Sequence, residues 1–146
     1  MSDCTGWICD TCGQIIEKPE DGYVQWVAFK DDDGQFGERD LSIVHHKTKS
    51  PLDAPDGCYI NETGGIYQDN DLQFFLSQNG LMQLLSMLDE GLLPTHQVIE
   101  VIKRLHIDGY EQARFHFDRA IAEGVFEPNT RPGFYFDWQI DAVLAW

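Results

Sequence analysis

The segment Gly6-Trp7-Ile8-Cys9-Asp10-Thr11-Cys12-Gly13 decides how the first part of this chain folds. Its two cysteines are separated by two residues, and a tight turn with this spacing directs both thiolates toward one centre. His45-His46 and then Cys58 follow further along the chain. A second pair of ligands arriving from a distant strand would close a tetrahedral site, the arrangement that zinc prefers with sulfur and nitrogen ligands. The sequence therefore predicts that a bound metal organises the chain up to Cys58.

The predicted metal ligands are Cys9, Cys12, Cys58 and one of the two adjacent histidines. Residues 40–45 alternate like a strand, so His45 shares a face with Leu41 and Ile43, and His46 lies on the opposite face. The later residue is freer to turn toward the cysteine turn, so His46 is the favoured ligand and His45 is the alternative. Three thiolates and a neutral imidazole make a closed, structural site.

The pattern W-x-C-x-x-C-G, followed by an aromatic strand at 23–29, resembles the first knuckle of zinc-ribbon proteins. The resemblance covers residues 6–58 and rests on Cys9, Cys12 and Gly13. It implies a zinc-ribbon-like module that holds structural Zn²⁺. The family usually completes its site with a second CxxC or a CxxH, whereas this chain offers one histidine and Cys58.

Cys4 supports a competing hypothesis. Together with Cys9, Cys12 and Cys58 it gives the spacing C-x4-C-x2-C…C, which resembles the cysteine ligands of plant-type [2Fe–2S] ferredoxins and implies electron transfer. Two observations argue against it. Cys4 lies in the first residues, where chains fray, and Trp7 is bulky for a loop that must wrap closely around a cluster. The role of Cys4 stays open.

The composition of the 146-residue chain predicts a globular protein with a buried core, because 42% of its residues are hydrophobic. No apolar run is long enough to cross a membrane. The first residues, Met1 to Thr5, lack the basic and apolar regions of a signal peptide. We therefore expect a cytoplasmic protein, and in a reducing cytoplasm cysteines are better metal ligands than disulfide partners.

The formal charge of −15 is spread over both halves of the chain. An acidic protein repels phosphate backbones and lacks the basic surface of nucleic-acid binders. The charge itself indicates solubility, and the more specific hypotheses are a basic partner protein or mimicry of nucleic-acid charge. We expect a protein partner, whose identity the sequence leaves open together with the oligomeric state.

The order of the elements predicts an α+β fold. A small zinc-stabilised β lobe over residues 1–64 would precede a helical lobe over residues 65–146, with both packed as one unit. The composition changes near Gly64-Gly65, and hydrophobic periodicity then predicts four to five helices. These expected helices cover 69–77, 79–90, a segment from Thr95 to about Leu105, 108–123 and 137–146. A short hairpin is expected between 125–127 and 134–136.

A helix, a turn at Asp108-Gly109, a second helix and a hairpin resemble a winged helix-turn-helix, which implies a nucleic-acid-binding regulator. Arg114 and Arg119 would be its phosphate contacts. Because phosphate contacts supply most of the affinity, two arginines among acidic residues make a poor groove reader. Nucleic acid is therefore the alternative partner.

No catalytic set can be named from the sequence, so the chain is predicted not to be an enzyme. A Cys–His nucleophile needs an imidazole beside its thiol, and His96, His106 and His116 have no cysteine nearby in the sequence. The predicted function is a non-catalytic zinc-binding adaptor or regulatory protein that acts by protein–protein interaction. Aromatic residues at 134–136 and Trp146 would either form its contact patch or pack in the core.

Overall fold

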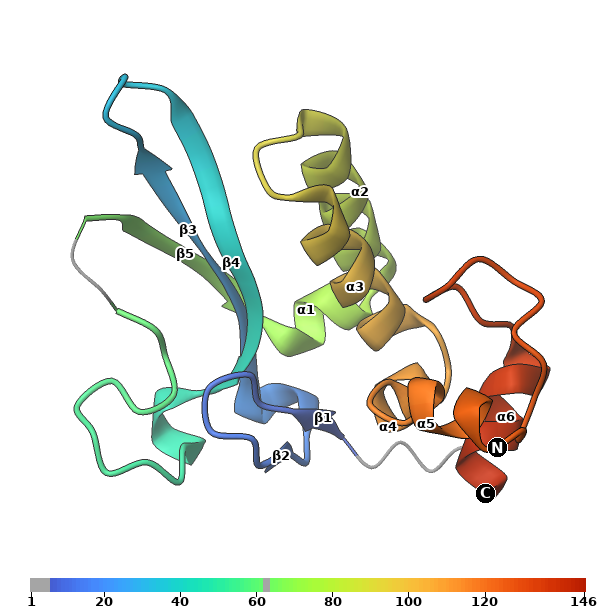
Figure 1. Ribbon diagram of the computed structural model, residues 1–146. Coiled ribbons are helices and arrows are strands. Elements are labelled where there is room, and N and C mark those ends of the chain that lie inside the picture. Colours follow the sequence, from blue (N-terminus) through green and yellow to red (C-terminus); the bar gives the residue numbers. More distant parts are fainter. Residues whose placement is uncertain (1–5, 62–63) are drawn as a thin grey trace. The chain divides into compact units, whose positions relative to one another are not determined.

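The main sheet is antiparallel, with the strand order β4-β3-β5 (Figure 1). The computed structural model describes residues 6–61 and 64–146. The three strands are β3 (Gly22–Lys30), β4 (Phe36–His45) and β5 (Ile66–Asp71). The register shifts between Gln25 and Val27 of β3, because β4 carries an extra residue opposite Trp26. Asp40 lies in this bulge and adopts a positive φ of 58°.

Three helices follow the sheet and share its core. They are α1 (Leu72–Leu76), α2 (Gln78–Glu90) and α3 (Thr95–His106), and they lie on one side of the strands in Figure 1. Ser77 caps α2 by accepting a hydrogen bond from the amide of Gly80, and Gly91 ends it in the left-handed conformation. The core includes Val24, Trp26, Ile43, Leu72, Phe75, Leu84 and Val98. The expected helices at 79–90 and from Thr95 are confirmed, whereas residues 69–71 belong to β5.

The opposite face of the sheet is covered by the loop that follows β4. Gln25 is fully buried, and its side chain forms two hydrogen bonds with the backbone of Ile60. Its amide nitrogen donates to the carbonyl, and its amide oxygen accepts from the N–H. A buried amide in the middle of a strand needs such partners, so Gln25 holds the loop on this face.

A second, very small sheet pairs β1 (Trp7–Ile8) with β2 (Ile15–Ile16). The described residues thus combine two small sheets with six α-helices, and the α+β prediction is confirmed. Within the described residues, no helix has both the length and the apolar character needed to cross a bilayer.

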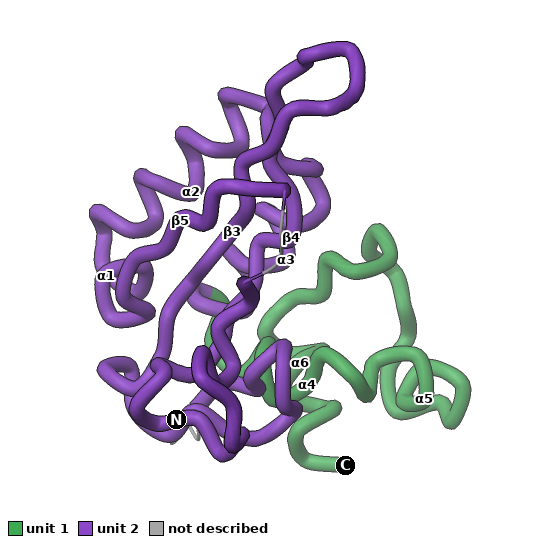
Figure 2. The backbone as a smooth tube through the Cα atoms, turned by 90° about the vertical axis from the view of Figure 1, so that its left-hand side faces the viewer, with its two compact units in different colours: residues 1–5, 107–146 green, residues 6–106 purple. Residues whose placement is uncertain are grey.

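The chain divides into compact units at His106/Ile107 rather than at the predicted 64/65 (Figure 2). The unit Gly6–His106 contains the sheets and α1–α3, because these helices bury their apolar faces on the sheet. The second unit contains α4 (Tyr110–Ala113), α5 (Phe117–Ala122) and α6 (Asp137–Ala145). Its core contains Tyr110, Ala113, Phe117, Ala120, Phe126, Ile140 and Val143.

The helix predicted over 108–123 is interrupted. Helix α4 ends at Ala113, the amide of His116 donates to the Ala113 carbonyl, and α5 begins at Phe117. The Phe117 ring lies 5.8 Å from the Tyr110 ring and 4.4 Å from the Tyr135 ring, measured between centroids. The turn places Phe117 in this aromatic cluster, which the helical period alone does not predict.

The predicted hairpin between 125–127 and 134–136 is wrong, since residues 107–146 are all described and contain no strand. The buried side chain of Gln139 takes the place of strand pairing. Its amide nitrogen donates to the carbonyl of Glu127 and the side chain of Asn129, and its oxygen accepts from the amide of Phe136. Without a hairpin, the second unit has no wing.

Replacement of Gly80 is predicted to destabilise the protein, even when the new residue is alanine, the best helix former. A Cβ at this position would lie 2.2 Å from Phe75 Cα and 2.3 Å from the Phe74 carbonyl oxygen, which are rigid backbone atoms. Helix propensity favours alanine by about 1 kcal/mol, but a clash of this size outweighs that gain. We expect Gly80→Ala to lower the free energy of unfolding by about 1–3 kcal/mol, measured by urea denaturation. Ser86→Ala, at an exposed position of α2, is the control and should be neutral or slightly stabilising.

Candidate metal centre

The turn between β1 and β2 forms the knuckle that carries the first two cysteines. The Cys9 amide donates to the Gln14 carbonyl, and the Gly13 amide donates to the Cys9 carbonyl. Gly13 has a φ of +78°, a conformation that side-chain-bearing residues rarely adopt. The amide of Gln14 also points at Cys12 Sγ, 3.4 Å away. These contacts direct the side chains of Cys9 and Cys12 toward the same centre.

Four side chains converge at this knuckle: Cys9, Cys12, His45 and Cys58. Their ligand atoms all lie within 4.8 Å of one another. His45 Nδ1 is 3.4 Å from Cys12 Sγ and 3.7 Å from Cys58 Sγ. Bonds of about 2.3 Å to sulfur and 2.0 Å to nitrogen in a tetrahedron separate the two ligand atoms by about 3.5 Å. The donor set and its spacing therefore fit a tetrahedral metal ion.

His45, and not the favoured His46, belongs to this cluster. His45 is 5% exposed and still paired in register with Gly22, so the strand keeps its side chain on the inner side. Its Nε2 lies 3.1 Å from the Ile15 carbonyl oxygen, which would accept the Nε2 hydrogen when Nδ1 binds a metal. The His46 ring instead stacks on Tyr23 at 4.5 Å, and its Nδ1 accepts from the Thr48 amide.

Cys58 reaches the cluster because the loop from 46 to 58 folds back. Its Sγ lies 2.9 Å from Ser50 Oγ, and its carbonyl accepts a 2.7 Å hydrogen bond from Thr11 Oγ1 of the knuckle. The thiol is fully buried. Burial raises the pKa of Cys58 to about 12 in the metal-free protein, although the Ser50 contact opposes this shift. Without a metal, the proton therefore stays on this thiol at neutral pH.

A partly buried ion pair attaches the knuckle to the rest of its unit, with the Arg104 side chain 3% exposed and the Asp10 side chain 30% exposed. The carboxylate of Asp10, which lies between the two cysteines, accepts from the Ile43 amide at 2.8 Å and from Arg104 Nη1 at 2.8 Å. Arg104 Nη2 also donates to the Ile8 carbonyl. Sequence analysis missed both residues. The available signal is that Arg104 continues the buried spacing of Val98 and Val101 on α3.

Cys4, the additional ligand of the [2Fe–2S] alternative, lies outside the described residues. The described cluster completes its set with a histidine rather than a fourth cysteine.

The two arginines of the nucleic-acid alternative both lie beside carboxylates. Arg114 Nε is 4.0 Å from Glu111, and Arg119 Nε is 2.8 Å from Glu123. The Arg119 guanidinium also lies 5.3 Å from the Trp146 ring centroid. Carboxylates this close reduce the positive potential that phosphate contacts require.

Comparison of the chain with protein-family models, curated proteins and solved structures found no match. No zinc-ribbon family is thus identified in residues 6–58, and the metal-binding geometry stands on the residues themselves.

The two histidines provide a direct test of the cluster. We expect purified protein to carry about one metal ion per chain, and we expect that ion to be zinc. His45→Ala should lose most of the metal because it removes a ligand, whereas the matched change His46→Ala should keep it. Elemental analysis of each variant measures the number of metal ions per chain. Equal losses in both variants, or a loss confined to His46→Ala, would contradict the geometry.

Metal binding should release a proton from Cys58 and weaken as the pH falls. The raised pKa keeps this thiol protonated between about pH 6 and pH 9, and only the thiolate binds metal. Each decrease of one pH unit should lower the apparent affinity for the metal at least about tenfold. Calorimetry in buffers of different ionisation enthalpy counts the protons. Cys58→Ser should release one proton fewer than the wild type at about pH 6.5 and pH 8.5, and an equal count would refute the assignment.

Proposed function

We propose that this protein is a non-catalytic, zinc-binding adaptor that acts by protein–protein interaction. The observation that carries the proposal is the convergence of Cys9, Cys12, His45 and Cys58 within 4.8 Å. Four protein ligands fill a tetrahedral shell, which leaves no position for a water molecule or a substrate. Cys9, His45 and Cys58 are also buried. Closed sites of this kind serve structure rather than chemistry.

Zinc is the ion that suits these ligands best. Thiolate ligands select soft or borderline ions, and a tetrahedral set of sulfur and nitrogen is typical of zinc. Bound zinc would join the knuckle, the end of β4 and the loop before β5, in the manner of a zinc-ribbon knuckle. The three described cysteines are free thiols. Cysteines stay reduced and available as metal ligands in a reducing compartment, so they favour the cytoplasm.

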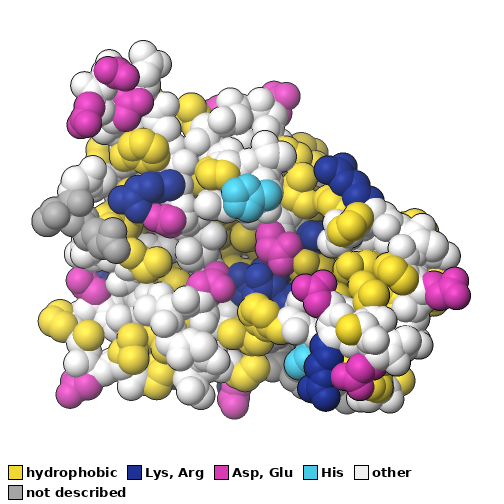
Figure 3. Space-filling model, in the orientation of Figure 1, with side chains coloured by type: hydrophobic (Ala, Val, Ile, Leu, Met, Phe, Trp, Pro, Cys, Tyr) yellow, Lys and Arg dark blue, Asp and Glu magenta, His cyan; other side chains and the backbone are white. Residues whose placement is uncertain are grey.

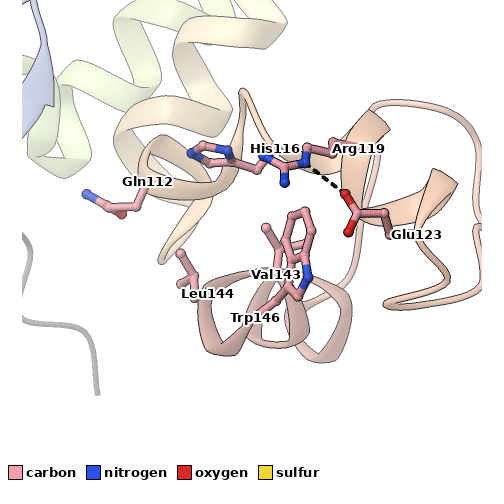
Figure 4. A pocket seen from close by; sticks show the side chains of 7 residues that line it. All are labelled: Gln112, His116, Arg119, Glu123, Val143, Leu144 and Trp146. Atoms are coloured by element: carbon pink, nitrogen blue, oxygen red, sulfur yellow. Dashed lines mark hydrogen bonds and ion pairs between the residues drawn. The ribbon is translucent and has the colours of Figure 1, made fainter.

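The unit Ile107–Trp146 supplies a surface for a partner. Helix α6 and its flanks expose large aromatic side chains: Phe136 is 60%, Trp138 50% and Trp146 48% exposed. Trp146 also borders a hollow of about 500 Å³, together with His116, Arg119 and Glu123 (Figure 4). Exposed aromatic side chains beside polar groups are typical of interaction surfaces.

Surface charge indicates the chemistry of the partner. Acidic side chains are scattered over the face seen in Figure 3 and outnumber the Lys and Arg side chains there, in keeping with a net charge of −15. Such a field attracts basic proteins and repels nucleic acid. It supports a protein partner over the winged-helix alternative, whose arginines lie beside carboxylates.

A photo-crosslinking amino acid at Trp138 tests the adaptor function. In cells that naturally produce the protein, we expect illumination to yield one or a few discrete crosslinked proteins, because a partner would cover this exposed side chain. The same amino acid at Ser86, exposed on α2, is the control and should give no such products. Mass spectrometry identifies the species. Identical patterns from the two positions, or none from either, would count against the proposed function.

A further inference from the structure

A hollow of about 430 Å³ lies directly beside the metal centre, and we call it the knuckle groove. One wall is the knuckle, with Cys12, Gln14 and Ile15, and the other is the loop after β4, with Lys49, Pro51 and Leu52. Each wall presents an exposed aliphatic side chain: Ile15 is 46% and Leu52 is 42% exposed. Each wall of the groove therefore offers one exposed apolar side chain.

Both walls are attached to metal ligands by hydrogen bonds. The Ile15 carbonyl lies 3.1 Å from His45 Nε2. On the other wall, the Leu52 amide donates to Ser50 Oγ, which itself contacts Cys58 Sγ at 2.9 Å. A metal held by Cys12, His45 and Cys58 would thus fix the distance between the walls. Such an ion would therefore restrict how far the two walls can move apart.

The groove carries a positive charge, which is unusual in this acidic chain. Lys49 is exposed and, among the described residues, forms no ion pair, whereas its neighbour Lys47 lies 3.5 Å from Asp56. No carboxylate is among the described lining residues, although the whole chain carries 25 acidic and 10 basic side chains. The Lys49 ammonium beside the aliphatic side chains of Ile15 and Leu52 is complementary to a carboxylate that follows an apolar side chain.

We propose that the knuckle groove binds an extended segment of a partner protein that carries a bulky apolar side chain next to an Asp or Glu. The apolar side chain lies between Ile15 and Leu52, and the carboxylate pairs with Lys49. Binding depends on the metal because the metal holds the two walls together. The inference rests on the proposed protein-binding function and assigns it a second surface, distinct from the aromatic one on α6.

Selection from a random peptide library displayed on phage, with the zinc-loaded protein as bait, tests the proposal. We expect the selected peptides to share an apolar residue adjacent to Asp or Glu. A fluorescent copy of the best peptide should bind at least about tenfold more weakly to Lys49→Glu and to Leu52→Asp, because one reverses the charge and the other makes the wall polar. Lys30→Glu makes the same charge change at an exposed lysine on β3 and should bind normally.

Removal of zinc with a chelator should abolish peptide binding, and re-addition should restore it. Leu52 and Lys49 are exposed, and the zinc content of each variant confirms that it has folded. A selection that yields no binder, peptides without an acidic residue, or binding insensitive to Leu52→Asp would overturn the groove. Peptides that bind through Trp138 instead would overturn it while leaving the adaptor function intact. Failure of the protein to hold zinc would refute the proposed function itself.

Discussion

Convergence of four ligand atoms is the constraint on which the N-terminal unit depends. Cys9, Cys12, His45 and Cys58 come from a knuckle, the end of a strand and a returning loop. The knuckle is too short to be stable alone, since the β1–β2 ladder has two residues per strand. A single shared ion would supply binding free energy that so small an element lacks. Metal binding and the folding of this unit would therefore be coupled.

The contact between Asp10 and Arg104 complements the ligands. Burial of the Arg104 charge costs free energy that its attraction to the partly exposed Asp10 only partly returns. In this structure the remaining polar groups are also satisfied, because Asp10 accepts from the Ile43 amide and Arg104 donates to the Ile8 carbonyl. The pair therefore fixes orientation: it attaches the knuckle to β4 and α3 at one angle. An apolar pair of similar volume would stabilise this attachment without specifying its angle.

Local signals made part of this structure predictable. The CxxC-Gly turn indicated the metal ligands on the knuckle, and the cap at Ser77 with the glycine at Gly91 matches the periodicity that predicted α2. Decisions made by tertiary contacts were not predictable. Gln139 satisfies backbone groups where a hairpin was expected. Likewise, pairing with Gly22 keeps His45 inside and leaves His46 to stack on Tyr23.

The Asp10–Arg104 contact has a consequence for synthesis on the ribosome. The two residues are 94 positions apart, so translation at about 5–20 residues per second separates their emergence by roughly 5–20 s. During that interval the knuckle has been made but its anchor has not, and for the first part of it Cys9 and Cys12 lack their partner ligands as well. A vicinal dithiol in this state is open to oxidation and to capture of the wrong metal. Correct assembly of the site therefore requires that chain elongation be faster than oxidation of these thiols or their capture of the wrong metal.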